Sequence, residues 1–379
     1  MIDFSLSDDL LEIRARAREF AREEILPIAA EYDQMAQMPP GIVAKARAAG
    51  LINVTVPKEY GGMGYGALES ALIAEELGAA CAGISITILV NGLALTPIQL
   101  FASEEQKNKF LLPVAKGGKL AAFCLTERGA GSDASAIQTT ALPDGKDFVI
   151  NGQKCFITSG GLADIMTVFA LTDPDRGPRG LSAIVVPADT PGIQVTKVED
   201  KMGQRASNTV ELTFENVRVP QENLLGKRGR GFPIALQTLD FGRSGVAALS
   251  VGVARAALEY AVAYAKERQQ FGSPINANQG VSFMLADMAM KVEAARLLTW
   301  QAAWYADRGV KVTDKSAMAK CFAADTAMAV TTDAVQVFGG YGYMKDHPVE
   351  KLMRDAKLLQ IYEGTNQIQR MVIARQLSK

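Results

Sequence analysis

One glutamate has neighbours that suit a general base. Glu363 follows Ile361 and Tyr362 and precedes Gly364 and Thr365. Apolar surroundings disfavour a charged carboxylate, so they raise its pKa toward the value of a usable base. Gly364 has no Cβ, which lets its backbone N–H approach a ligand closely. The residues alone leave two interpretations open, a catalytic base and an ordinary solvated glutamate at a helix end, and the second is the commoner arrangement.

A second candidate is a loop rich in glycine and small hydroxyl residues. It reads Leu125-Thr-Glu-Arg-Gly-Ala-Gly-Ser-Asp133 and follows a strand-like run. An ordinary turn and a ligand-binding loop fit this composition equally well. The loop lacks the spacing Gly-x-Gly-x-x-Gly, and the chain has no Gly-x-x-x-x-Gly-Lys-Ser/Thr. Neither a Rossmann nucleotide site nor a P-loop is therefore supported.

A third candidate places a cation and an aromatic ring together. The segment Arg268-Gln-Gln-Phe271-Gly272 ends a helical pattern. It could bind a ligand, although an ordinary helix C-terminus closed by glycine accounts for it slightly better.

The composition excludes several classes of function. The 379 residues include 40 basic and 41 acidic side chains, for a net charge of −1, which disfavours nucleic acids and anionic membranes as partners. Cys81, Cys124, Cys155 and Cys321 are scattered, and His347 is the single histidine. This pattern predicts no metal site and no disulfide framework. The start Met1-Ile-Asp-Phe-Ser does not resemble a secretory signal, so we expect a cytoplasmic location.

One uncharged stretch is long enough to cross a bilayer. It runs over residues 77–103 but contains Asn91, Gly92 and Pro97, and charged amphipathic segments lie on both sides. We predict a buried helix here and no membrane span.

These candidates lie on three regions that differ in their pattern of apolar and polar residues. Together the three regions predict an α+β multidomain fold. Residues 1–120 read as an N-terminal α-helical domain, with Ser7 as a helix cap and Ser103-Glu-Glu-Gln106 as a capping box. Residues 121–231 alternate apolar and polar side chains and predict a middle β domain. Asn151-Gly152 predicts a hairpin turn within it. Residues 232–379 predict a C-terminal four-helix bundle.

The combination of motifs strongly resembles the acyl-CoA dehydrogenase family over essentially the whole chain. The family has the same order of a helical domain, a β-barrel-like middle domain and a helical bundle. The resemblance rests on Thr126-Glu-Arg-Gly-Ala-Gly-Ser-Asp133, Ile150-Asn-Gly-Gln-Lys154, Phe156-Ile-Thr158, Arg268-Gln-Gln-Phe-Gly272, Gln336-Val-Phe-Gly-Gly340, Arg354-Asp-Ala356 and Ile361-Tyr-Glu-Gly-Thr365.

The resemblance implies FAD as cofactor and a homotetramer in which a neighbouring chain completes the FAD site. Positions that match the flavin-ring lining are Phe123, Leu125, Thr126, Gly131, Ser132, Phe156, Ile157 and Thr158, and Thr365 and Gln367 match other flavin contacts. Positions that match contacts to the adenine-diphosphate half across the subunit interface are Arg268, Phe271, Gln279, Gln336, Gly339 and Gly340.

The resemblance also implies the chemistry. Glu363 matches the base that removes the α proton of an acyl-CoA thioester while the β hydrogen leaves as hydride to the flavin. The Gly364 N–H matches a donor to the thioester carbonyl, and Asp240, Arg243 and Ser132 match positions on the substrate side. A minority branch of the family carries its base near Leu239-Asp-Phe-Gly-Arg243, where this chain has Gly242, so Glu363 is the candidate base.

The resemblance implies an acyl-CoA substrate and an electron-transferring flavoprotein as electron acceptor. Phe156 stands where many members carry tryptophan, and Asn91 and Gly92 lie in the segment that closes the acyl pocket, which fits a short acyl group. Branched, cyclic or medium-length acyl groups and the enoyl-CoA reductase direction stay open. The alternatives are an acyl-CoA oxidase, disfavoured by the short chain, and a catalytically silent acyl-CoA-binding scaffold, disfavoured by the intact flavin motifs.

Overall fold

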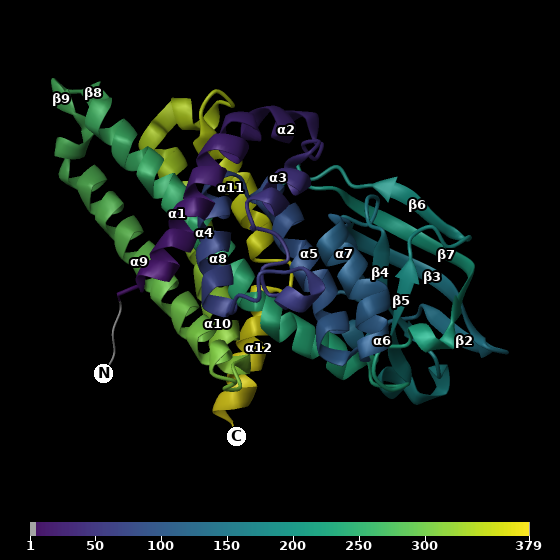
Figure 1. The fold of residues 1–379 in the computed structure, drawn as a ribbon. Coiled ribbons are helices and arrows are strands. Elements are labelled where there is room, and N and C mark those ends of the chain that lie inside the picture. The colour runs from purple at the N-terminus through teal and green to yellow at the C-terminus, as the bar shows by residue number, and fades with distance from the viewer. Residues whose placement is uncertain (1–4, 379) are drawn as a thin grey trace.

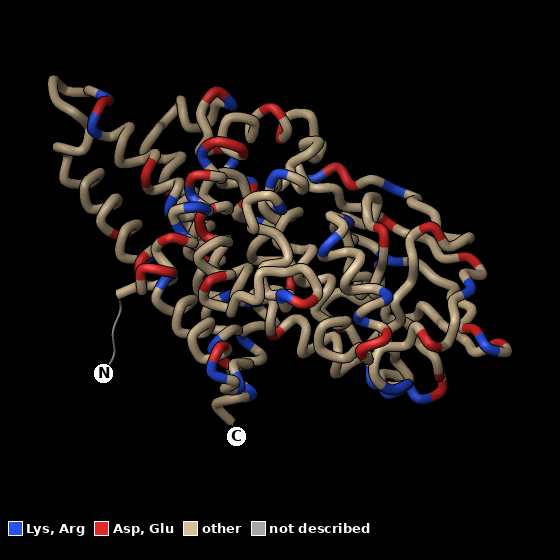
Figure 2. The backbone as a smooth tube through the Cα atoms, viewed as in Figure 1, with Lys and Arg blue, Asp and Glu red and all other residues tan. Residues whose placement is uncertain are grey.

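A computed structural model describes residues 5–378 of the chain. Helices come first, a curled β-sheet follows, and further helices complete the chain, as the sequence predicted. Figure 1 shows the sheet at one side of the molecule and the long C-terminal helices at the other, with N-terminal helices packed against both. Basic and acidic residues are interspersed along the chain (Figure 2).

The N-terminal helices begin where the capping signals predict. Ser7 accepts a hydrogen bond from the Leu10 N–H, and Ser103 and Gln106 form a complete capping box. The uncharged stretch divides at Cys81 into two mostly buried helices, α4 and α5. The helices are α1 (Asp8–Phe20), α2 (Ala29–Met35), α3 (Ile42–Ala48), α4 (Ala67–Ala80), α5 (Ala82–Phe101), α6 (Glu104–Gln106) and α7 (Leu112–Gly117), with a π-helical turn (Ala21–Ile25) and a 3₁₀ turn (Leu26–Ile28) between α1 and α2.

The sheet has the order β1-β4-β2-β3-β7-β6, with β5 paired to β4. Strand β1 is parallel to β4, whereas β3 pairs antiparallel with β2 and β7. The strands are β1 (Ala121–Cys124), β2 (Thr140–Asp144), β3 (Asp147–Thr158), β4 (Ile165–Leu171), β5 (Leu181–Pro187), β6 (Ile193–Val198) and β7 (Thr209–Pro220).

The predicted hairpin at Asn151-Gly152 is wrong. Strand β3 runs straight through both residues, and the turn between β2 and β3 lies at residues 145–146 instead. Gly152 sits where the pairing of β3 with β7 shifts register, at a φ of 150°, and a Cβ there would overlap with Thr139. The glycine is therefore required by close packing at a β-bulge. In the sequence, the resulting Asn-Gly pair looks the same as one that forms a turn.

The C-terminal region contains α8 (Gly231–Glu267), α9 (Gln279–Asp307), α10 (Thr313–Phe338), α11 (Pro348–Leu359) and α12 (Asn366–Leu377), with a small hairpin of β8 (Gln269–Gln270) and β9 (Ser273–Pro274) between α8 and α9. Alanines dominate the contact between α8 and α10, which lets these helices pack closely. Residues 360–365 separate α11 from α12 in this region. Both α5 and α8 are long and apolar enough to cross a membrane, but most of each helix is buried inside the fold.

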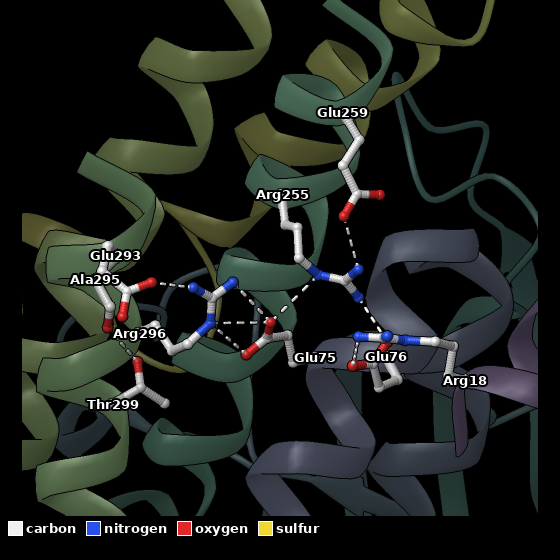
Figure 3. A network of polar contacts seen from close by, with 9 residues as sticks. All are labelled: Arg18, Glu75, Glu76, Arg255, Glu259, Glu293, Ala295, Arg296 and Thr299. Atoms are coloured by element: carbon white, nitrogen blue, oxygen red, sulfur yellow. Dashed lines mark hydrogen bonds and ion pairs between the residues drawn. The ribbon is translucent and has the colours of Figure 1, made fainter. Parts of the chain in front are cut away.

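A chain of buried ion pairs joins the two helical regions (Figure 3). Glu75 and Glu76 on α4 are nearly inaccessible. Arg255 on α8 contacts both carboxylates, Arg296 on α9 binds Glu75 at 3.0 Å, and Arg18 on α1 binds Glu76 at 2.9 Å. Each buried charge has an opposite partner, so the network can stabilise the contact between these four helices.

Candidate active site

The turn between α11 and α12 carries the candidate base. Glu363 has a φ of 52° and Gly364 a φ of 88°, so two successive residues are left-handed. This conformation is unfavourable for a glutamate and persists only where surrounding contacts impose it. The turn separates α11 from α12, and Glu363 lines a cleft beside it.

The Glu363 carboxylate has an unusual environment. The residue lines a cleft, but its Oε2 atom is buried and has no hydrogen-bond partner among residues 5–378. Burial raises the pKa of Glu363 from an ordinary value of 4.5 to about 7, while the Lys320 and Arg243 cations act in the opposite direction. A carboxyl group with this pKa can accept a proton near neutral pH.

A cleft of about 480 Å³ opens between the sheet, α5, α8 and the Glu363 turn. Its volume lies within the range of roughly 300–1,000 Å³ that is typical of ligand-binding pockets. The cleft is lined by the predicted residues Phe123, Leu125, Thr126, Gly131, Ser132, Phe156, Ile157, Thr158, Arg243, Glu363 and Gly364.

A second, mostly apolar cavity of about 90 Å³ meets the cleft at Glu363. Its walls come from α4, α5, α8 and the loop before α4. Leu93 and Val90 belong to both spaces, and Gly242, Gly245 and Gly92 line the second cavity alone. Asn91 points elsewhere, since its side chain bonds Asn53 at 2.8 Å and the Ala121 N–H at 2.7 Å. The Glu363 carboxylate therefore stands at the entrance to an apolar chamber.

A buried ion pair supports the loop on the sheet side of the cleft. Lys154 is fully buried and donates to Glu127 Oε1 at 2.7 Å and to the Leu125 carbonyl at 3.0 Å. The Glu127 carboxylate also accepts the backbone N–H groups of Gln138 and Thr139. These bonds fix the path of residues 125–127, of which Leu125 and Thr126 line the cleft.

The structure places the other predicted residues outside this cleft. Phe271 is 98% exposed in the β8–β9 hairpin, at the end of the molecule remote from the sheet (Figure 1). Arg268 stacks over Tyr341 at 5.5 Å, beside Gly339 and Gly340. Thr365 caps α12 by accepting the Ile368 N–H, and Asp240 pairs with Arg243. The remaining predicted residues are Gln279 at the start of α9, Gln336 near the end of α10, and Gln367, exposed on α12.

Two residues that the motifs did not indicate contact the Glu363 turn. Lys320 on α10 and Gln369 on α12 are completely buried and bond to backbone carbonyls of the turn. Lys320 is a single cation within an alanine-rich helical segment, a pattern that could have marked it in the sequence.

Comparison with known proteins assigns the family. Three family models match, described as the acyl-CoA dehydrogenase N-terminal domain over residues 7–118, the middle domain over 122–217 and the C-terminal domain over 229–378. The chain belongs to the acyl-CoA dehydrogenase family. It is a flavin-dependent oxidoreductase with FAD as cofactor.

Two acyl-CoA dehydrogenase relatives carry names that specify a substrate. A short-chain specific acyl-CoA dehydrogenase of Clostridium acetobutylicum is 46% identical, with 98% of this chain and 99% of the relative covered. An acryloyl-CoA reductase (NADH) of Anaerotignum propionicum is 45% identical, with 100% and 96% covered.

Solved structures give the same result. Butyryl-CoA dehydrogenase from Megasphaera elsdenii is 45% identical with a TM-score of 0.97, and both chains are covered in full. A chain from a study of the electron transferring flavoprotein of Acidaminococcus fermentans is 49% identical with a TM-score of 0.97 over 99% of each chain. PigA with FAD and proline is 33% identical with a TM-score of 0.96, over 100% of this chain and 99% of PigA.

The residues of the cleft fit FAD. Its sheet side presents small residues and hydroxyl groups, Thr126, Gly131, Ser132 and Thr158, and a Cβ added to Gly131 would meet no atom within 4 Å. A flat ring system can approach such a wall closely, and the backbone and hydroxyl groups offer hydrogen bonds to its polar edge.

Proposed function

We propose that this chain removes two hydrogens from a saturated short-chain acyl-CoA and forms the trans-2-enoyl-CoA, with Glu363 as the base. One observation supports this most directly. The Glu363 Oε2 atom, which is buried and has no hydrogen-bond partner among residues 5–378, lies where the cleft meets the apolar chamber. A thioester that placed its acyl group in the chamber and its CoA in the cleft would bring its α carbon beside this carboxylate.

In this proposal Glu363 takes the α proton, and the electron pair of that C–H bond becomes the new C=C bond. FAD, when bound, accepts the β hydrogen together with its electron pair as a hydride. The Gly364 N–H lines the same cleft and donates a hydrogen bond to the thioester carbonyl, which stabilises the negative charge that develops there. One such donor typically contributes about 3–4 kcal/mol to transition-state stabilisation.

The short acyl group is supported by the names of two similar proteins, the short-chain specific enzyme and butyryl-CoA dehydrogenase. The chamber is a small, mostly apolar space between helices, which suits a short acyl group. Branched, cyclic and medium-length acyl groups are the alternatives to test beside butyryl-CoA.

The test is anaerobic bleaching of the protein-bound flavin by a panel of butyryl, hexanoyl, octanoyl, isobutyryl, isovaleryl and cyclohexanecarboxyl-CoA. We expect butyryl-CoA to bleach the flavin fastest. Glu363→Gln keeps the shape of the side chain and removes the base, so it should retain FAD and acyl-CoA binding and lose nearly all bleaching. Glu12→Gln, at an exposed position on α1, is the matched control. Bleaching by Glu363→Gln at the wild-type rate would contradict the proposed base.

The reverse direction is the second candidate, favoured by the similarity to an acryloyl-CoA reductase. The same base can return a proton to the α carbon while a hydride reaches the β carbon. Dithionite-reduced enzyme mixed with crotonyl-CoA would reoxidise quickly in that case, and its equilibrium with butyryl-CoA would favour the saturated thioester.

We infer that an electron-transferring flavoprotein is the electron partner. A similar chain comes from a study of such a protein, and Phe156, 63% exposed at the cleft, provides an apolar edge for docking. Reduced enzyme should be reoxidised by an added electron-transferring flavoprotein faster than by oxygen.

We further infer a homotetramer whose neighbouring subunit completes the FAD site. Arg268 and Phe271 lie far from the cleft of their own chain, and Phe271, Phe283 and Met290 expose large apolar side chains. Sedimentation should give four copies, and Arg268→Ala should lose FAD on dilution. A wild-type monomer that retains FAD would contradict this assembly.

A further inference from the structure

Two buried side chains form hydrogen bonds to backbone carbonyls of the Glu363 turn. Gln369 Nε2 on α12 donates to the Glu363 carbonyl at 3.2 Å and to the Gly364 carbonyl at 3.0 Å. Lys320 Nζ on α10 donates to the same Gly364 carbonyl at 2.8 Å. Both side chains have no exposed surface. The two successive carbonyls of the turn are therefore held by side chains from two helices, α10 and α12.

The direction of these carbonyls determines where the Gly364 N–H points. The peptide bond between Glu363 and Gly364 is trans, because residues 5–378 contain no cis peptide. In a trans peptide the C=O and N–H point in opposite directions. Gln369 holds the Glu363 carbonyl on the helix side, so the Gly364 N–H is directed to the other side, where Gly364 lines the cleft.

Lys320 is itself held in place. Lys320 also donates to Asn366 Oδ1 at 3.0 Å. The Asn366 amide in turn donates to the Cys321 carbonyl and to Asp325 Oδ1. The missing side chain of Gly364 leaves room for this arrangement, since a Cβ there would lie 2.6 Å from Gln369 Nε2. A rigid support of this kind limits the turn to one geometry.

We propose that Lys320 and Gln369 are positioning residues of the reaction, which hold the carbonyls of Glu363 and Gly364 so that the Glu363 carboxylate and the Gly364 N–H face one thioester. This inference deepens the proposed function and rests on it. Gln369 sets the direction of the N–H donor. Lys320 fixes the next peptide and places a positive charge beside the base.

The charge of Lys320 separates the roles of the two residues. The charged groups that act on Glu363 are Lys320 and Arg243, and both favour the ionised carboxylate. Lys320 itself is influenced by Glu363, Arg243, Cys321 and Asp325, and burial lowers its pKa to about 8. Loss of Lys320 should therefore change the pH dependence of proton abstraction. Loss of the neutral Gln369 should leave the pH dependence unchanged.

The experiment uses the FAD-loaded protein and the near-isosteric variants Gln369→Leu and Lys320→Met. For Gln369→Leu we expect flavin reduction by butyryl-CoA to slow by roughly tenfold or more, with an unchanged pH profile. For Lys320→Met we expect slower reduction and an apparent pKa that rises by roughly 1. Isotope-edited infrared spectra of bound [1-¹³C]crotonyl-CoA give a readout independent of turnover. The carbonyl stretch should lie at higher frequency in both variants, because the carbonyl is less polarised.

Lys315→Met on α10 and Gln376→Leu on α12 are matched controls on the same helices, and neither residue contacts the turn. If Lys320→Met does not fold, Lys320→Gln removes the charge and keeps a donor. Folded variants with wild-type reduction rates and an unchanged carbonyl frequency would overturn the proposal. If the wild type itself is not reduced by any acyl-CoA, the proposed function fails. The carbonyl frequency of bound crotonyl-CoA then still tests whether Lys320 and Gln369 hold the turn in position.

Discussion

Gly242 on α8 lies directly opposite Glu363, so close that a Cβ on Gly242 would overlap with the Oε2 atom of the carboxylate. The two residues are 121 positions apart in the chain and meet because α8 passes beside the turn between α11 and α12. The glycine creates the space that the base occupies. A base at position 242 on α8 and a base on the turn would therefore occupy the same space, so the chain can carry only one of them.

Gly242→Ala should impair the reaction without unfolding the protein. The added methyl group would displace the Glu363 carboxylate and the end of Leu93, both of which are flexible side-chain ends. Alanine is favoured over glycine in a helix by about 1 kcal/mol, which offsets part of the steric cost. We expect flavin reduction to slow by roughly a hundredfold, with the melting temperature nearly unchanged. Gly117→Ala, at an exposed helix end with ordinary contacts, is the control, and wild-type reduction by Gly242→Ala would contradict the proposed location of the base.

The rate of flavin reduction should increase with pH. Burial raises the pKa of Glu363 to about 7, and only the ionised carboxylate can accept a proton. Stopped-flow reduction by a saturating acyl-CoA should be slow near pH 5.5 and approach a plateau above pH 8. A rate that is constant over this range would show that deprotonation of Glu363 does not limit the step.

The same pKa predicts an effect on stability. The folded protein binds the Glu363 proton more tightly than the unfolded chain, whose carboxyl has the ordinary pKa of 4.5. The contribution to the free energy of unfolding is thus present below pH 4.5 and is lost as the pH rises through 7. Glu363→Gln should be more stable than the wild type at pH 8, by up to about 3 kcal/mol, and equally stable near pH 4.5. Denaturant unfolding of the two proteins at both pH values measures this difference.

The sequence predicted those features of the fold that depend on a local pattern of residues. Helix caps at Ser7 and Ser103 and the order of helices, sheet and helices were predicted correctly, because they depend on neighbouring residues and on periodicity. The motifs also indicated Glu363 and ten other residues that line the cleft. The hairpin at Asn151-Gly152 failed because the requirement for glycine there comes from Thr139 on another strand.

The support of the site could be predicted only in part from local patterns. The alanine-rich surroundings of Lys320 could have marked it as unusual, but its contact with the turn spans 44 residues of sequence and depends on how α10 packs against the turn. The break between α11 and α12 is also tertiary in origin, because the left-handed backbone of Glu363 is stabilised by Gln369 and Lys320.

The size of the acyl group should respond to Gly245. This residue lines the apolar chamber one turn beyond Gly242, and a Cβ added there meets no atom within 4 Å. Gly245→Ala therefore narrows the chamber without a clash. One methylene in an apolar pocket changes discrimination by roughly 10–200-fold. We expect Gly245→Ala to lower the ratio of kcat/KM for hexanoyl-CoA to that for butyryl-CoA by a factor within this range. An unchanged ratio would show that the acyl group binds elsewhere.

The buried ion-pair network should contribute to stability through Glu76. The Glu76 side chain is 2% exposed and is the shared partner of Arg18 and Arg255 (Figure 3). Glu76→Gln would leave the buried Arg255 with less negative charge around it, and breaking a buried pair typically costs about 3–5 kcal/mol. Glu259→Gln removes another partner of the same arginine, but Glu259 is 61% exposed, so this control should lower stability by less than about 1 kcal/mol. Denaturant unfolding of both variants with FAD bound measures the difference, and equal losses would show that burial does not determine the strength of these pairs.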